Sequence, residues 1–186
     1  MRCSQWLVAA FTLVLAGSAT AASWQSQASV SELAFFVNYE GADAPGYFGR
    51  FRVEVDSAAG ESGPSALFVK IDIASASMGS TDFDETIAEP VWFDSLGFPE
   101  ATFSSHSIKP LQGGRYLAEG TMTLKGVRQA LSVPFSWVAD GNRAEMSGTV
   151  TLSRVDFNIG GGVWSSDDSI GHLVRVQFKV VLSPGS

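Results

Sequence analysis

Residues 173–182 read LVRVQFKVVL, and this stretch decides the fold class. Apolar residues at every second position alternate with Arg175, Gln177 and Lys179. Successive side chains of a β-strand point to opposite faces, so this pattern predicts a strand with one apolar and one charged face. The apolar face consists of Val174, Val176, Phe178, Val180 and Leu182.

The same alternation recurs along most of the chain. We expect strands around residues 33–39, 47–56, 67–73, 101–109, 115–124, 131–138, 143–155 and 173–182. Within 47–56, the residues Tyr47, Gly49, Phe51, Val53 and Val55 are expected to share one face. Turn-forming residues separate the strands at 60–64, 112–114 and 140–142. Strands joined by short turns favour an antiparallel barrel or sandwich over a parallel α/β sheet.

One segment departs from the strand pattern. Residues 82–89 read DFDETIAE and are long enough for two helical turns. Asp82 is the expected N-cap, with Glu85 three residues later as in a capping box, and Pro90 favours the end of the helix. Phe83 and Ile87 lie one helical turn apart, so both can face the sheet. The segment predicts a short helix across one end of a barrel.

The composition excludes several classes of protein. The 186 residues are 45% hydrophobic and 17% charged, and 19 acidic residues against 12 basic ones give a net charge of −7. Without a Lys/Arg cluster, binding to a nucleic acid backbone is not expected. One cysteine excludes a disulfide framework and a cysteine-based zinc or iron–sulfur site.

The N-terminus has the features of a secretory signal peptide over residues 1–21. Arg2 precedes an apolar run at 6–15, and Ala19-Thr20-Ala21 has the small-x-small form of a cleavage site. The alternative is an uncleaved membrane anchor, although the run is about half the ~20 apolar residues that a spanning helix needs. Cleavage near Ala21 would remove the only cysteine and leave a single domain over residues 22–186.

The sequence contains no motif for a reaction. It has no G-x-S-x-G elbow, no P-loop and no H-E-x-x-H pair. The two histidines, His106 and His172, are interpreted as exposed residues in or beside strands, and the acids of 82–94 as capping and solvated groups. No catalytic residue, metal ligand or cofactor is therefore predicted.

Five segments, in order, resemble the YceI-like family of periplasmic polyisoprenoid-binding proteins, over about Ser29 to Leu182. They are GYFGRF at 46–51; IDIAS at 71–75; DETI at 84–87 with WFD at 92–94 and FPEATF at 98–103; YLAEGTMTLKGV at 116–127; and LSRVDFNIGGGVW at 152–164. The glycine-rich part before Trp164 is most similar to the branch of the family that is associated with cytochrome b561-type membrane proteins. Thr86 and Asn158 depart from the residues usual in the family, which are His or Glu at the first position and Gly at the second.

This resemblance implies an all-β, lipocalin-like, extended antiparallel barrel of about eight strands with a short helix near one end. It also implies a periplasmic protein that binds a polyprenyl chain or an isoprenoid quinone in an apolar lumen, without catalysis and without spanning the membrane itself. A cytochrome b561-type membrane protein is the partner that it suggests. The alternative is a structural or partner-binding barrel or sandwich with a filled core, accessory to a membrane redox protein.

Combining the alternation with the resemblance gives a set of expected lumen residues. They are Phe35, Val37, Phe51, Val53, Val69, Ile71, Phe103, Trp137, Phe157, Trp164 and Phe178. Arg154 and Asp156 lie two residues apart on one face of the expected strand and are interpreted as a structural charge pair near its end. Contact between Arg154 and a ligand head group is the less favoured alternative.

Overall fold

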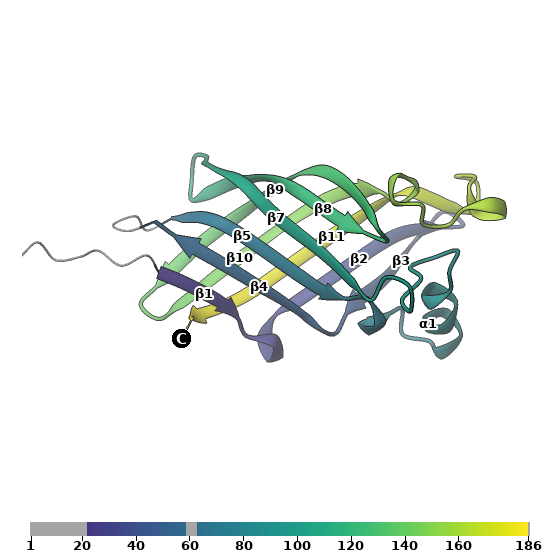
Figure 1. Cartoon of the computed structure of the whole chain (residues 1–186), viewed down its shortest axis with the longest axis horizontal. Helices are drawn as coiled ribbons and strands as arrows, with labels where there is room; N and C mark the ends of the chain where they lie inside the picture. The colour runs from purple at the N-terminus through teal and green to yellow at the C-terminus, as the bar shows by residue number, and fades with distance from the viewer. Residues whose placement is uncertain (1–21, 59–62, 186) are drawn as a thin grey trace, which may run out of the picture.

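The computed structural model describes residues 22–58 and 63–185, and most of these residues form β-strands (Figure 1). The strands are β1 (Ala22–Ser26), β2 (Glu32–Tyr39), β3 (Ala42–Phe48), β4 (Phe51–Ser57), β5 (Pro64–Asp72), β6 (Ala76–Ser77), β7 (Glu100–Pro110), β8 (Arg115–Leu124), β9 (Val127–Asp140), β10 (Arg143–Ser153) and β11 (Ile170–Pro184). The helices are α1 (Thr81–Ala88) and the 3-10 helices η1 (Ala28–Val30), η2 (Ile73–Ser75), η3 (Arg154–Phe157) and η4 (Gly162–Trp164). The expected signal peptide and most of the expected turn at 60–64 lie outside the described residues.

The strands form one antiparallel sheet that closes into a barrel. Its order is β1-β4-β5-β7-β8-β9-β10-β11-β2-β3-β6, and an additional pairing of β1 with β11 closes a ring of eight strands. Trp24 of β1 lies opposite Val55 of β4 on one side and Pro184 of β11 on the other. The long strand β11 pairs with β1 at its C-terminal end and with β2 along residues 170–179. The predicted fold class, a barrel of about eight strands with a helix near one end, is confirmed.

The orientation of β11 also agrees with the prediction from its sequence. Val180 and Leu182 point inward and are 1% and 0% exposed. On the outer face, Arg175 forms an ion pair with Asp43 at 2.6 Å, and Lys179 lies 3.7 Å from Glu145. The apolar faces of the strands therefore meet inside the barrel and the charged faces meet water.

The predicted strand at 47–56 is wrong, because the chain turns in its middle. Gly49 and Arg50 separate β3, which pairs with β2 and β6, from β4, which pairs with β1 and β5. The turn changes which residues point inward, so Tyr47 is 52% exposed while Phe48 packs against Phe35 with ring centroids 5.3 Å apart. The alternation continues through the turn in the sequence, and for this reason it does not reveal the break.

Helix α1 lies at one end of the barrel, beside the ends of β2 and β3, as expected (Figure 1). Its N-cap is Ser80 rather than the predicted Asp82. The carboxylate of Asp84 instead accepts hydrogen bonds from the Met78 amide (2.6 Å) and the Ser77 hydroxyl (2.8 Å). These bonds fix the start of the helix to the preceding loop. Within residues 22–58 and 63–185, no helix is long and apolar enough to cross a membrane.

Candidate functional site

The barrel encloses a cavity of about 660 Å³ with almost entirely apolar walls. This volume lies in the range of small-molecule binding sites. The walls come from inward-facing residues at alternate positions of the strands. From β2, β4, β5, β7 and β8 they are Leu33, Phe35, Val37, Phe51, Val53, Leu67, Val69, Ile71, Ala101, Phe103, Met122 and Leu124; from β9, β10 and β11 they are Leu131, Val133, Met146, Val150, Leu152, Val174, Val176, Phe178 and Val180.

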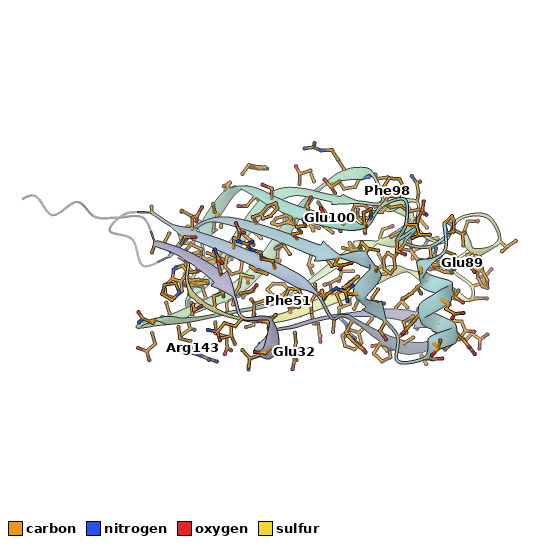
Figure 2. The ribbon with its side chains drawn as sticks, turned by 60° about the horizontal axis from the view of Figure 1, so that its bottom comes forward. Glu32, Phe51, Glu89, Phe98, Glu100 and Arg143 are labelled. Atoms are coloured by element: carbon orange, nitrogen blue, oxygen red, sulfur yellow. The ribbon has the colours of Figure 1, made fainter. Side chains whose placement is uncertain are left out.

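One end of the barrel is filled by side chains, and we call it the closed end. It is defined by Trp24, Val55, Trp137, Ala144 and Leu182, none of which lines the cavity. Val55, Ala144 and Leu182 are 0% exposed, and the rings of Trp24 and Trp137 meet edge to face with centroids 5.9 Å apart. Figure 2 shows Arg143 at this end and Glu89 at the opposite one. Packed side chains therefore fill this end of the barrel.

The cavity reaches the surface at the α1 end, which we call the mouth and define by Tyr39, Phe83 and Trp164. All three residues line the cavity and are nevertheless 40%, 49% and 39% exposed. Tyr39 and Phe83 contact each other with ring centroids 6.5 Å apart, and Trp164 packs on Trp92 at 5.8 Å. An apolar molecule could enter between α1 and the connection that carries Trp164.

The cavity wall presents almost no polar groups. Apart from the polar tips of aromatic residues, the polar side chains that line it in the described residues are Thr86 and Arg154. The Thr86 hydroxyl donates to the Asp82 carbonyl within α1 at 2.8 Å. A molecule in the cavity would therefore be recognised by its shape and apolar surface rather than by directed hydrogen bonds.

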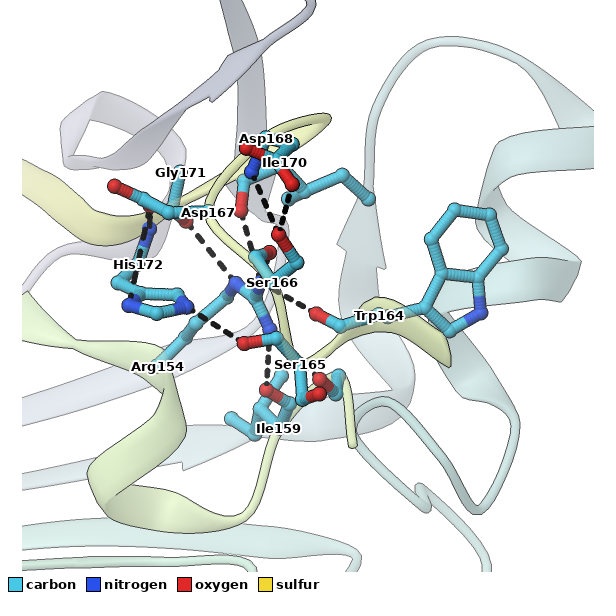
Figure 3. Close-up of polar contacts among 11 residues, drawn as sticks. Arg154, Ile159, Trp164, Ser165, Ser166, Asp167, Asp168, Ile170, Gly171 and His172 are labelled. Atoms are coloured by element: carbon cyan, nitrogen blue, oxygen red, sulfur yellow. Dashed lines mark hydrogen bonds and ion pairs between the residues drawn. The ribbon is translucent and has the colours of Figure 1, made fainter. Parts of the chain in front are cut away.

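Arg154 is 2% exposed, and its guanidinium faces backbone carbonyls (Figure 3). An arginine has five N–H donors, and here all of them have backbone acceptors. The acceptors are the carbonyl oxygens of Ile159 (2.9 Å), Gly160 (2.9 Å), Trp164 (2.7 Å), Ser166 (3.3 Å), Ile170 (2.8 Å) and Gly171 (3.0 Å). No donor is left to contact a ligand head group, which was the alternative role considered for Arg154.

The predicted charge pair between Arg154 and Asp156 is wrong. β10 ends at Ser153, and Arg154 begins the 3-10 helix η3 instead of continuing the strand. With three residues per turn, positions two apart point in different directions. Arg154 is consequently buried while Asp156 is exposed. Burial lowers the pKa of the Arg154 guanidinium and Asp167 partly offsets this, but an arginine remains protonated.

A second cation ties loops together at the same end. Lys125, in the turn between β8 and β9, donates from Nζ to the carbonyls of Pro90 (2.7 Å) and Asn158 (2.8 Å). Burial lowers the pKa of Lys125, an effect that Asp94 partly opposes.

Asn158 has a left-handed backbone with φ of 56°. Asparagine tolerates this conformation better than most residues, which explains how it replaces a glycine here.

Most of the residues predicted for the lumen lie on the cavity wall. Nine do so: Phe35, Val37, Phe51, Val53, Val69, Ile71, Phe103, Trp164 and Phe178. Trp137 does not, because it points inward beyond the cavity and packs in the closed end. Phe157 does not either, because it belongs to η3 and is buried in the core at 2% exposure. Binding of a ligand by any of these residues remains a prediction.

Sequence reasoning missed three aromatic residues that line the cavity, one at the end of β3 and two in the loop after α1. Phe48 and Phe93 line it and pack against each other at 5.9 Å, and both contact Phe35. Trp92 lines it from the same loop as Phe93. The adjacent pair Trp92-Phe93 in a loop was the available signal, since large aromatic residues outside strands need a surface to pack on.

The polar residues elsewhere do not form a cluster that could hold a metal ion. Within residues 22–58 and 63–185, no three His, Cys, Asp or Glu side chains gather in one place. His172 contacts the Ser165 carbonyl through Nε2 at 2.8 Å, and His106 is exposed at a bulge of β7. The two histidines therefore do not face the cavity.

Comparison with known proteins places this geometry in a family context. Residues 24–182 match the family model described as YceI-like domain. A UPF0312 protein of Shewanella baltica is 26% identical over 120 residues, which cover 61% of this chain and 63% of the relative. The chain thus spans less than two thirds of that relative's length.

Two solved structures share the fold. Burkholderia cenocepacia BcnA matches with a TM-score of 0.79 at 25% identity, over 84% of this chain and 98% of BcnA. A polyisoprenoid binding domain from Saccharophagus degradans matches with a TM-score of 0.69 at 15% identity, over 87% of this chain and 98% of that domain. At 15% identity, the similarity to the Saccharophagus degradans domain shows a shared fold alone.

Proposed function

The chain belongs to the YceI-like family, and from this premise we propose that it is a carrier for an isoprenoid lipid held in the barrel cavity. The ligand is a polyprenyl chain or an isoprenoid quinone, and the protein catalyses no reaction on it. The observation that carries the proposal is the apolar cavity, which reaches the surface at the mouth. Apart from the polar tips of aromatic residues, the polar side chains that line it among the described residues are Thr86 and Arg154, and both are bonded to backbone carbonyls.

The physical chemistry of such a site favours a long apolar tail. Burying one CH₂ group contributes about 0.8 kcal/mol, so a branched hydrocarbon chain gains affinity along its whole length. The wall is built from branched and aromatic side chains that accept such a chain without directed bonds. A small polar metabolite would instead lose its hydrogen bonds to water and gain none.

The charges at the mouth favour an uncharged head group. Asp82 is exposed on α1 directly before Phe83, and Asp167 and Asp168 are exposed on the connection that carries Trp164. The nearby cations Arg154 and Lys125 are engaged with backbone carbonyls. A quinone ring or a free alcohol therefore suits this end better than a phosphate, which the carboxylates would repel.

The alternative, a structural or partner-binding barrel, requires a filled core. A cavity of about 660 Å³ is difficult to reconcile with that requirement, because protein interiors otherwise pack with few voids larger than a water molecule. We therefore favour the carrier function.

The cellular setting is part of the proposal. Signal peptide cleavage near Ala21 would deliver the protein to the periplasm, where the ligand is exchanged with a membrane. The glycine-rich segment before Trp164 suggests a cytochrome b561-type membrane protein as the partner. N-terminal sequencing of the exported protein tests the cleavage, and an intact Met1 in the membrane fraction would refute it.

The binding site is tested by placing the same charge on the two faces of one strand. Val176 lines the cavity, and its neighbour Gln177 is exposed on the outer face between Arg175 and Lys179. Val176→Asp should weaken binding of a fluorescent polyprenyl probe at least about a hundred-fold, because a buried carboxylate costs several kcal/mol. Gln177→Asp should bind like the parent. Equal affinity of Val176→Asp and the parent would remove the cavity as the site.

A further inference from the structure

The connection between η3 and β11, together with the first two residues of β11, forms one wall of the mouth. We call residues Ile159–Gly171 the mouth loop. Ile159, Trp164 and Ile170 of this loop line the cavity, whereas Val163 is 89% exposed on its outer side. A ligand that passes through the mouth therefore passes between this loop and α1.

Backbone hydrogen bonds hold the mouth loop near its two ends. The Gly160 amide donates to the Val91 carbonyl and the Glu40 amide donates to the Ser169 carbonyl, each at 2.8 Å. Among the described residues, the backbone bonds of residues 161–168 are internal to that segment. The middle of the loop consequently depends on side chains for its position.

Arg154 bonds to both ends of the loop and to two carbonyls of its middle, those of Trp164 and Ser166, while His172 contacts Ser165 and Asp167. All six of its carbonyl acceptors belong to the mouth loop, so one guanidinium gathers oxygens that are spread over thirteen residue positions, 159–171. The guanidinium also lies 5.9 Å from the ring centroid of Trp92, on which Trp164 packs at 5.8 Å. The position of the Trp164 indole at the mouth therefore depends on Arg154.

Gly160 allows the close approach of Arg154. A Cβ atom at this position would lie 2.3 Å from Nη1 of Arg154 and 2.9 Å from the Trp92 ring. Gly160 also has a left-handed backbone, with φ of 71°. The glycine is thus required both by the backbone conformation and by the guanidinium that packs on it.

We propose that Arg154 is a positioning residue that holds the mouth loop in place and thereby sets the rate at which an apolar ligand enters and leaves the cavity. This inference rests on the proposed carrier function. Loosening the loop widens the passage without changing the strand residues that contact a bound tail. Association and dissociation should therefore both accelerate, while the affinity changes little.

The first test replaces Arg154 by lysine, which keeps the charge but has three donors from one nitrogen and cannot reach six carbonyls. Mixing the purified protein with a fluorescently labelled farnesyl probe gives the association rate, and chasing the loaded protein with unlabelled farnesol gives the dissociation rate. The association and dissociation rates of the probe should both rise at least about ten-fold in Arg154→Lys. A change of about ten-fold is the factor that corresponds to losing one charge-assisted hydrogen bond. Hydrogen exchange of the amides of residues 161–168 should rise in parallel.

Lys125→Met is the control for losing bonds from a cation to loop carbonyls elsewhere at this end. Lys125 also joins loops at this end through two carbonyls, but only Arg154 bonds to the mouth loop. The Lys125 variant should have a lower melting temperature and the probe exchange rates of the parent. Faster exchange in this variant as well would mean that general destabilisation, rather than the Arg154 contacts, controls the mouth.

A second pair of variants reaches the same contacts without changing the arginine, and it decides the question if Arg154→Lys does not fold. Gly160→Ala pushes a methyl group against the guanidinium, whereas Gly162, with φ of 63°, has open space where a Cβ would lie. Both substitutions strain a left-handed backbone, but only Gly160→Ala should accelerate exchange strongly.

The outcomes separate this inference from the proposed function. If the parent binds the farnesyl probe and Gly160→Ala exchanges it at the parent rate, or Gly162→Ala accelerates it equally, the role of Arg154 is refuted and the carrier function stands. If the parent binds no probe, the carrier function fails and the inference fails with it.

Discussion

The two ends of the barrel are built from the same alternating strands but differ in what fills them. At the closed end, small residues such as Ala144 and large ones such as Trp137 pack closely, and the exposure of its residues falls to between 0% and 9%. At the mouth, cavity-lining aromatic residues remain partly exposed, with Trp164 at 39% and Phe83 at 49%. The short strand β1 lies near the closed end, where it pairs with β4 on one side and with β11 on the other. It brings Trp24 into contact with Trp137.

This difference shows that inward orientation and cavity formation are separate properties. The alternation decides which side chains point inward along every strand. Whether the interior is filled depends on which elements meet there: at the closed end a strand adds a tryptophan, and at the mouth a helix and loops leave an opening. One end would therefore supply stability, and the other would supply binding.

The largest effect on stability is expected when a leucine is shortened to alanine in the closed end and on the cavity wall. Leu182→Ala, in the closed end, should lower the free energy of unfolding by about 2–5 kcal/mol, because it creates a cavity in a packed region. Leu152→Ala, on the existing cavity wall, should cost less than about 2 kcal/mol, because the space next to it is already open. Urea unfolding of both variants measures the contrast. Equal losses would mean that the mouth half is packed as tightly as the closed end.

A smaller effect is expected from adding the same bulk at the two ends. Ala144→Leu, where the alanine is 0% exposed, should destabilise the protein by about 1–3 kcal/mol through overpacking. Ala44→Leu, which extends into the cavity from β3, should change stability by less than about 1 kcal/mol and should weaken probe binding by filling space. Thermal unfolding and probe titration distinguish the two variants. A stability loss at Ala44 comparable to that at Ala144 would contradict the open cavity.

The charge of the mouth should select among ligand head groups. A farnesyl diphosphate should bind several-fold more weakly than farnesol at low salt, since each carboxylate near the mouth contributes about 1 kcal/mol or less through water. Raising the salt concentration should reduce this difference, and Asp82→Asn should reduce it as well. Tighter binding of the diphosphate than of farnesol would show that an uncharged head group is not preferred.

The smallest effect on stability is expected for a residue on the outer face of the barrel, which belongs neither to the closed end nor to the mouth. Glu119 forms an ion pair with Lys109 at 2.7 Å, and the hydrogen bond from Lys109 holds the pKa of Glu119 below its ordinary value. A carboxylate with a lowered pKa stabilises the folded state above its unfolded pKa, and this contribution is lost as the pH falls through the folded pKa. Glu119→Gln should thus slightly reduce stability at neutral pH and not at pH 3. A difference that persists unchanged at pH 3 would exclude the ion pair as its cause.

The sequence predicted the strands well where alternation is uninterrupted and less well where a loop intervenes. In β11 the pattern correctly assigned Val176 inward and Lys179 outward. Between β3 and β4 it failed at Gly49 and Arg50, because a two-residue turn preserved the apparent alternation while the chain changed its strand partners.

The site was predictable from its strands but not from its loops. Eight of the nine expected lumen residues that line the cavity lie in strands, where alternation determines their direction, and the ninth, Trp164, lies in η4. Trp137 was beyond the reach of this reasoning, because its position along the barrel depends on the contact with Trp24 from a distant strand. The role of Arg154 was also beyond it, since its acceptors are backbone carbonyls and no side-chain motif marks them.

The central claim is that the cavity between the closed end and the mouth holds an isoprenoid lipid. Native mass spectrometry of the protein, purified without detergent from its own host, tests this claim most directly. The account predicts adducts on the parent whose masses correspond to lipids built from whole isoprene units, their loss in Val176→Asp and their retention in Gln177→Asp. A parent without any lipid adduct, or an adduct retained equally in Val176→Asp, would contradict it.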